Sequence, residues 1–174
     1  SIIPDKMGSL LFLAAGLVTA GAALAQDSSK RASGRVPVVY NLQSGIAATP
    51  VKSQGATGTC WCFSTTSLVE SQCLKNKLGT FDLSEMFTVR NIYIEKAKNY
   101  ILRQGHAQFG EGGLGHDLIR AIATYGAMPE SVYSGIKEGD TQYDHSKMAP
   151  ALKEYLDSIL KLNPVPANWL NGYT

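Results

Sequence analysis

The chain approaches its most distinctive segment through a glycine-containing turn and continues from it as an uncharged helix. The segment reads QGATGTCWCFS and runs from Gln54 to Ser64. Gly55 and Gly58 permit a tight turn, so that the first residue of the following helix can face a cleft. The pattern therefore predicts a helix that begins at Cys60, with its thiol at the partially positive N-terminal end.

A thiol in this position can serve as a nucleophile. Only the thiolate attacks, and a helix N-terminus favours that anion. The backbone N–H of Cys60 has no intrahelical partner, so it can donate to an oxygen that becomes negative. The side-chain amide of Gln54 can supply a second donor, and Trp61 can pack behind the site. Cys60 and Gln54 are therefore the candidate catalytic residues, and a buried structural thiol is the alternative for Cys60.

The two other cysteines, Cys62 and Cys73, fall within the same predicted helix. The helical rise separates their Cα atoms by about 16 Å, whereas a disulfide needs about 7 Å or less. Cys60 and Cys62 point to opposite faces, so no pair inside the helix can close. We predict three free thiols, with Cys62 and Cys73 in the core. A Cys-x-Cys metal site is a weak alternative, because it requires two further ligands and the histidines are scattered.

The N-terminal stretch has the pattern of a targeting signal. Lys6 precedes an uncharged apolar run over residues 10–24, and a small-x-small sequence ends at Ala25. This pattern predicts a secretory signal peptide over residues 1–25 that is cut before Gln26. Export to the periplasm or the exterior is expected. An uncleaved membrane anchor is the alternative, although the run is short for a membrane span of roughly 20 residues.

The remaining sequence predicts a linker and one domain. Polar residues 26–35 indicate a flexible linker, and the domain then covers residues 36–174. Residues 36–40 predict a short strand, at a sheet edge because Pro37 cannot donate a ladder hydrogen bond. Apolar periodicity predicts four helices, which span residues 60–77, 84–103, 116–125 and 146–162.

The first predicted helix has identifiable ends. Thr59 is the expected N-cap and Gly79 the expected stop. The absence of charge between Cys60 and Val69 predicts that the first turns are buried. Glu70 is expected to mark the point where the helix meets water.

The later helices show capping signals and apolar stripes. Asp82, followed three residues later by Glu85, suits a capping box, and Ser84 is an alternative cap. The stripes expected to face the core comprise Leu83, Phe87, Ile94, Ala97 and Ile101 in the second helix, Leu118, Ile119 and Ile122 in the third, and Leu152, Tyr155, Leu156 and Ile159 in the fourth.

Composition narrows the classes of function. Apolar residues make up 44% and charged residues 17% of the 174 residues, as in ordinary globular proteins. The formal net charge is +2 and the Lys and Arg residues are scattered, so the chain lacks the basic patch that binds nucleic acid. Nothing in the sequence indicates a cofactor or a bound metal ion.

The segment around Cys60 resembles the papain-like cysteine peptidases. Residues 49–55, with the sequence TPVKSQG, are similar to that family's lead-in to its nucleophile. Cys60 and Trp61 follow Gln54 at the family's spacing. The chain departs from papain at Thr57, where papain has a disulfide cysteine.

The resemblance continues, with less specific motifs, as far as residue 133. Residues 81–85 are similar to the family's Leu-Ser start of the next helix, and Gly112 and Gly113 to its paired substrate-binding glycines. The chain is more similar to the bleomycin hydrolase and aminopeptidase C branch than to papain in two places. These are the residues near Cys60 that differ from papain, and the stretch over residues 112–133.

This resemblance implies an α+β, papain-like fold. It implies a mainly helical N-terminal lobe around a buried central helix that starts at Cys60, with the β-rich second lobe absent or incomplete. It implies that Cys60 is the nucleophile and Gln54 the oxyanion donor. Gly112 and Gly113 would hydrogen-bond an extended peptide, and simple loop flexibility is the alternative role for these glycines.

The resemblance leaves two catalytic roles unassigned. In the family, a base histidine and an orienting asparagine lie in a second, β-rich half. The histidines here are His106, His116 and His145, and none is assigned as the base; Asn168 is not assigned as the orienting residue. We therefore expect the chain to be the nucleophile-bearing half of a larger peptidase, weak or inactive by itself, with a second lobe or an oligomer partner to complete it.

The expected function is that of an exported cysteine peptidase that cleaves peptide or protein substrates through an acyl-enzyme on Cys60. Aminopeptidase action is implied by the branch resemblance alone. Two alternatives stay open. One is a catalytically inactive, peptidase-like module that binds peptides or a partner protein, and the other is a truncated gene product without a function of its own.

Overall fold

The structure is a computed structural model that describes residues 39–174. The chain divides into two units, residues 1–42 and 43–174, and the second is described here by itself. The predicted signal peptide, the linker and residues 36–38 of the predicted strand lie outside the described residues. Val39 and Tyr40 form no strand, so the strand prediction is wrong for the two residues that can be compared.

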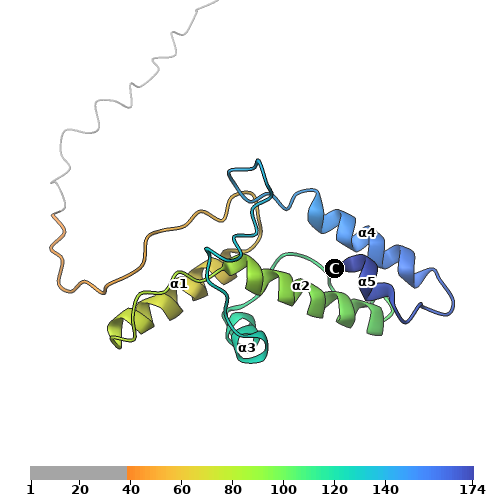
Figure 1. Cartoon of the computed structure of the whole chain (residues 1–174), viewed down its shortest axis with the longest axis horizontal. Coiled ribbons are helices and arrows are strands. Elements are labelled where there is room, and N and C mark those ends of the chain that lie inside the picture. Colours follow the sequence, from red (N-terminus) through yellow and green to blue (C-terminus); the bar gives the residue numbers. More distant parts are fainter. Residues whose placement is uncertain (1–38) are drawn as a thin grey trace, which may run out of the picture. The chain divides into compact units, whose positions relative to one another are not determined.

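The described part of the chain consists of helices joined by irregular segments (Figure 1). Their bounds are Cys60–Lys75 (α1), Glu85–Leu102 (α2), Gly115–Tyr125 (α3), Met148–Leu160 (α4) and Trp169–Tyr173 (α5). α3 contacts both α1 and α2, α4 contacts α2, and α5 contacts α4. Within residues 39–174 there is no strand, only isolated bridges between Ala56 and Asp144 and between Leu83 and Pro129. The described residues are therefore mainly helical and do not confirm the α+β class.

Apolar side chains of the helices form two clusters. The first joins α1, α2 and α3, and its buried members are Trp61, Cys62, Met86, Val89, Ile92, Tyr93, Leu118 and Ala121. The second joins the C-terminal half of α2 to α4, and its buried members are Ala97, Tyr100, Ile101, Leu156 and Ile159. α2 thus supplies side chains to both clusters. No helix among the described residues is long and apolar enough to cross a membrane.

α1 begins at Cys60, as predicted, but its ends are built differently. The hydroxyl of Thr59 pairs with that of Thr57 at 2.5 Å and does not cap the helix. At the other end the N–H of Leu78 donates to the carbonyl of Cys73, in a Schellman-type ending that places Lys77 at φ 56°. The helix therefore stops before Gly79, and the predicted glycine stop is wrong.

The buried face of α1 is narrower than predicted and includes a carboxylate. Only Trp61, Cys62, Thr66 and Glu70 are buried along the helix, so its first turns are buried on one face rather than throughout. Glu70 is 1% exposed, which contradicts its predicted place at the water boundary. Its acceptors bind partners from elsewhere in the chain, which makes burial of the charge tolerable.

α2 begins with a serine cap. The hydroxyl of Ser84 accepts the N–H of Phe87 at 3.0 Å, so Ser84 is the N-cap and the Asp82–Glu85 capping box is wrong. Glu85 is instead buried at the first helical position. The buried face also differs from the predicted stripe, because Phe87 and Ile94 are only partly buried. The aromatic residues Tyr93 and Tyr100, which the prediction omitted, lie in the core.

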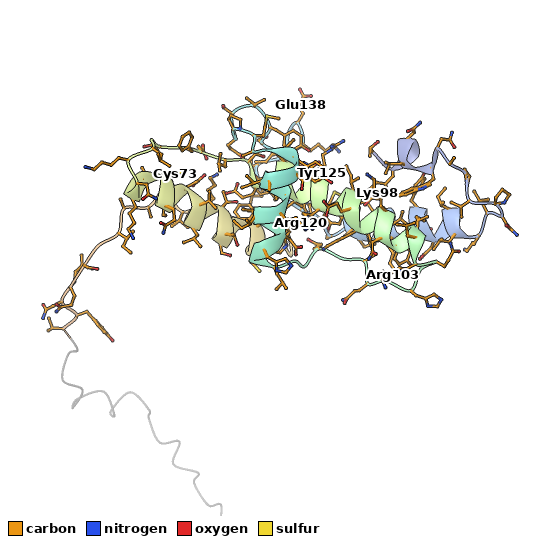
Figure 2. The ribbon with its side chains drawn as sticks, turned by 90° about the horizontal axis from the view of Figure 1, so that it is seen from below. Cys73, Lys98, Arg103, Arg120, Tyr125 and Glu138 are labelled. Carbon is orange, nitrogen blue, oxygen red and sulfur yellow. The ribbon has the colours of Figure 1, made fainter. Side chains whose placement is uncertain are left out.

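α3 and α4 agree with the predicted helices within a few residues. α3 buries Leu118 and Ala121, whereas Ile119 is 53% exposed, so the prediction for Ile119 is wrong. α4 buries Leu156 and Ile159 as expected. Figure 2 labels Arg120 and Tyr125 on α3, and both side chains bind the carboxylate of Glu95 on α2. The short helix α5 was not predicted.

Candidate active site

Cys60 occupies the first turn of α1 and is exposed. The first N–H groups of a helix have no intrahelical acceptor. In the described part of the chain, the N–H of Cys60 has no other backbone acceptor either. The first turn of α1 carries no acidic residue that would oppose an anion there. An accessible thiol and a free N–H thus lie at one helix terminus, as the sequence predicts.

Gln54 is part of the turn that leads into Cys60. Its side-chain Nε2 donates to the carbonyl of Thr57 at 2.5 Å, and the hydroxyl of Thr57 donates to the carbonyl of Gln54 at 2.8 Å. These reciprocal bonds close the turn between the two residues. An amide nitrogen carries two hydrogens, so the bond to Thr57 leaves one donor of Gln54 for another acceptor.

Gly55 is required by the path of this turn. Its φ is +59°, and a Cβ atom there would lie 2.3 Å from the carbonyl oxygen of Tyr143. The neighbouring Ala56 donates its N–H to that same carbonyl at 2.9 Å, and His145 donates its N–H to the carbonyl of Ala56 at 3.1 Å. The segment over residues 143–145 therefore supports the turn from one side.

A buried charge cluster anchors the chain just before the turn. The Nζ of Lys52 lies 2.7 Å from Asp82, 3.1 Å from Glu85 and 3.9 Å from Glu70. Glu70 also accepts the hydroxyl of Thr49 at 2.5 Å and the N–H of Leu83 at 2.8 Å. The cluster joins the lead-in to α1 and α2.

Burial and the neighbouring charges shift the pKa values of Lys52 and Glu85 in this cluster. Burial by itself would lower the pKa of Lys52, but the bond to Asp82 and the charge of Glu85 raise it above its ordinary value. Burial raises the pKa of the Glu85 carboxyl above its ordinary value, although Lys52 acts in the opposite direction. The sequence did not predict this cluster, because its members are dispersed along the chain. The one available signal was Glu70, a charged residue that directly follows an uncharged run.

The glycine-rich loop passes close to the start of α1. The N–H of Gly58 donates to the carboxylate of Glu111 at 2.6 Å, and the indole N–H of Trp61 donates to the carbonyl of Glu111 at 3.1 Å. Trp61 is buried behind Cys60, in agreement with the prediction. Glu111 was not a predicted site residue, and its sequence context offered no specific signal.

The paired glycines differ in their surroundings. A Cβ atom on Gly113 would lie 2.7 Å from the indole ring of Trp61, whereas one on Gly112 would meet nothing within 4 Å. The ammonium of Lys96 on α2 binds the carbonyls of Gly110 and Gly112. Burial lowers the pKa of Lys96, although nearby Asp117 and Glu111 act in the opposite direction. Gly113 thus packs closely against Trp61, the residue next to Cys60, and Gly112 is open.

The three histidines lie in different places. His106 and His116 are exposed, and His116 lies 3.6 Å from Asp117. His145 is 8% exposed, and its Nδ1 lies 3.5 Å from the carboxylate of Glu111. No hydrogen bond joins a histidine to Cys60 within residues 39–174. Asn168 precedes α5 and forms no side-chain cap there. The described residues also hold no group of three or more His, Cys, Asp or Glu that could bind a metal ion.

The sequence was compared with known proteins. The family model described as "Papain family cysteine protease" matches residues 36–133, which is more than half of the chain. The chain therefore belongs to the papain family of cysteine proteases. The matched region includes α1, α2, α3 and the glycine-rich loop, whereas His145, α4 and α5 lie beyond it.

A curated relative gives a consistent but shorter match. Over 50 residues the chain is 42% identical to "Cysteine proteinase 1" of Dictyostelium discoideum. The aligned stretch is 29% of this chain and 15% of that protein. The chain thus matches only a small part of the relative's length, so the activity of a whole protease is a proposal for this chain.

Proposed function

We propose that the protein is a cysteine peptidase that cleaves peptide bonds through a thiolate at Cys60. The observation that carries this proposal is the exposed thiol at the N-terminus of α1, beside a backbone N–H without an acceptor, in a chain of the papain family. A helix N-terminus favours the anion that attacks. Cys62 and Cys73 lie further along the same helix and do not share this position.

The reaction would proceed in two stages. The sulfur of Cys60 attacks the carbonyl carbon and forms a C–S bond, and the C–N bond then breaks as the amine leaves with a proton. Water next attacks the thioester, releases the carboxylic acid and restores the thiol. The oxygen that becomes negative would accept the N–H of Cys60 and the free amide hydrogen of Gln54.

An extended peptide would bind along the glycine-rich loop. A cavity of about 350 Å³ lies there, and its lining residues are Lys96, Gln108, Gly110, Gly112, Gly113 and Leu114. Gly112 is open to an approaching backbone, because no neighbouring atom lies near its missing Cβ. A glycine lets a second backbone approach closely, which suits strand-like binding of a substrate.

The base that accepts the thiol proton would come from outside the described residues. His106 and His116 are exposed away from any hydrogen bond to Cys60, and His145 faces Glu111. We infer that a second lobe, or a partner subunit, supplies the base and its orienting residue. General acid–base assistance is worth about a hundred- to ten-thousand-fold in rate, so the chain by itself would be weak or inactive.

Two finer features of the proposal rest on sequence patterns. The residues over 112–133 support membership of the bleomycin hydrolase and aminopeptidase C branch, and hence aminopeptidase action. The apolar run over residues 10–24 supports export through a cleaved signal peptide, or retention by an uncleaved anchor. The N-terminal residue of the mature protein, determined by peptide sequencing, would test export: Gln26 is expected, and retention of residues 1–25 would contradict cleavage.

A catalytically inactive, peptide-binding module is the second candidate. It is favoured by the absence of any histidine bound to Cys60 within residues 39–174. Such a module would use the same glycine-rich loop without chemistry. The two functions differ in whether Cys60 forms a covalent intermediate with a substrate.

Trapping of that intermediate would test the proposal. The chain is incubated with a peptide thioester, a substrate whose leaving group needs no protonation, and intact mass is measured before and after. Acylation of the protein at Cys60 is expected, with none in the Cys60→Ala variant and normal acylation in Cys73→Ala. A wild-type chain that binds the peptide without acylation would support the binding module instead.

A further inference from the structure

Glu111 holds the start of α1 at two points, one on each side of the nucleophile. Its carboxylate accepts the N–H of Gly58 at 2.6 Å, and its backbone carbonyl accepts the indole N–H of Trp61 at 3.1 Å. Gly58 lies before Cys60 in the chain and Trp61 directly after it. We propose that Glu111 is a positioning residue that fixes the reactive orientation of Cys60, a role that rests on the peptidase function proposed above.

The loop that carries Glu111 is itself anchored. Lys96, on α2, binds the carbonyls of Gly110 and Gly112, which lie immediately before and after Glu111. The backbone on both sides of the residue is therefore tied to a packed helix. A side chain that starts from a fixed backbone can hold its partner with little loss of conformational entropy.

The turn is also supported from its other side. The backbone N–H of His145 donates to the carbonyl of Ala56 at 3.1 Å, and the Nδ1 of His145 lies 3.5 Å from the Glu111 carboxylate. This Nδ1 is buried and has no hydrogen-bond partner in the described residues. The Glu111 carboxylate thus has two neighbours, the Gly58 N–H and the His145 imidazole.

The contacts of Glu111 with Gly58 and Trp61 join two parts of the site that a substrate would use together. The paired glycines follow Glu111 directly, and the N–H of Cys60 lies at the end of the turn that Glu111 holds. A hydrogen bond to a carboxylate is charge-assisted and stronger than a bond between neutral groups, so the 2.6 Å bond from the Gly58 N–H can hold the turn next to the glycine-rich loop.

Two substitutions separate the reach of the Glu111 side chain from its charge. Loss of the bond to Gly58 would release the turn and slow the alkylation of Cys60. Glu111→Gln keeps the side-chain length and an acceptor oxygen for the Gly58 N–H but removes the charge. Glu111→Asp keeps the charge but shortens the side chain by one methylene, so that the carboxylate no longer reaches this N–H.

The experiment measures the rate of iodoacetamide labelling at each cysteine by peptide mass spectrometry. Glu111→Asp and Glu111→Ala are expected to label Cys60 about tenfold more slowly than the wild type, because no acceptor oxygen then reaches the Gly58 N–H. Glu111→Gln, which keeps an acceptor at the same reach, is expected to label it at about the wild-type rate. Hydrogen exchange should accelerate at the Gly58 amide in the Asp and Ala variants, and circular dichroism verifies that each variant is folded.

Glu138→Ala provides the matched control, because Glu138 is exposed on the irregular segment between α3 and α4 (Figure 2). If Glu111→Ala does not fold, the Asp and Gln variants decide the question. The positioning role would be overturned if Cys60 were labelled at the wild-type rate in Glu111→Asp, or more slowly than in the wild type in Glu111→Gln. Labelling of Cys60 that is no faster than that of Cys73 in the wild type would instead contradict the proposed peptidase function, so the two failures can be distinguished.

Discussion

At the scale of single residues, two cysteines that are close in α1 have opposite surroundings. Cys60 is exposed, whereas Cys62 is fully buried and its Sγ donates to the carbonyl of Glu85 at 3.4 Å. Burial raises the pKa of the Cys62 thiol to about 12. Cys62 therefore remains a protonated core residue near neutral pH, whereas Cys60 is accessible. Cys73, which was predicted to lie in the core, is only partly buried.

Loss of Lys52 should destabilise the fold. It faces three carboxylates, two of which, Glu70 and Glu85, are nearly inaccessible to water. Removal of one partner leaves buried charge without compensation, so Lys52→Met should lower the free energy of unfolding by about 2–3 kcal/mol. Urea denaturation measures the change. Lys98→Met, at an exposed position on α2 (Figure 2), is the control, and an equal effect of both variants would contradict this role.

Glu85 should make the stability depend on pH. Burial raises the pKa of its carboxyl, so its contribution to stability is present below its ordinary pKa and is lost as the pH rises through the folded value. The free energy of unfolding of the wild type, relative to that of Glu85→Gln, should therefore fall as the pH rises above the ordinary pKa of a glutamate, about 4.3. Urea titrations at a series of pH values that starts below that pKa measure the difference, with Glu154→Gln as a surface reference. A difference that rises with pH would mean that the ion pair with Lys52 outweighs burial.

At the scale of secondary structure, the ends of the helices are less predictable than their existence. The apolar periodicity predicts α1 to α4, because that signal repeats over many residues. The caps depend on one or two side chains with local alternatives. Thr59 binds Thr57 instead of capping α1, and Ser84 replaces the predicted Asp82. The short helix α5 has too few turns to produce a periodic signal.

The end of α1 offers a stabilising substitution. Lys77 has a φ of 56°, a left-handed conformation that costs a residue with a Cβ more than it costs glycine. Lys77→Gly should raise the free energy of unfolding by about 0.5–1 kcal/mol. Gln72→Gly, at an exposed position inside the same helix, should lower it by about 1 kcal/mol. Thermal unfolding distinguishes the two, and destabilisation by both variants would contradict the assigned conformation.

At the scale of the whole molecule, the candidate site is built by contacts between segments far apart in sequence. Local sequence identifies Cys60, Gln54 and the paired glycines, because their spacing is itself the signal. It does not identify Glu111, whose role depends on a loop approaching the start of α1. It also misplaces Glu70, since Thr49 and Leu83 reach it only through the tertiary fold.

The same architecture leaves Cys60 accessible. α1 buries Trp61 and Cys62 against α2 and α3, while Cys60 stays exposed. No histidine is hydrogen-bonded to Cys60 within residues 39–174, so the peptidase function proposed above requires a base from elsewhere.

The central claim is that Cys60 is an activated thiol, and its alkylation rate as a function of pH tests this most directly. Labelling of Cys60 by iodoacetamide is expected to exceed that of Cys62 and Cys73 at each pH, because Cys60 is exposed at the helix N-terminus. Cys73 lies at the far end of α1 (Figure 2) and serves as the internal reference. Labelling of Cys60 that is no faster than that of Cys73 at every pH would contradict the account.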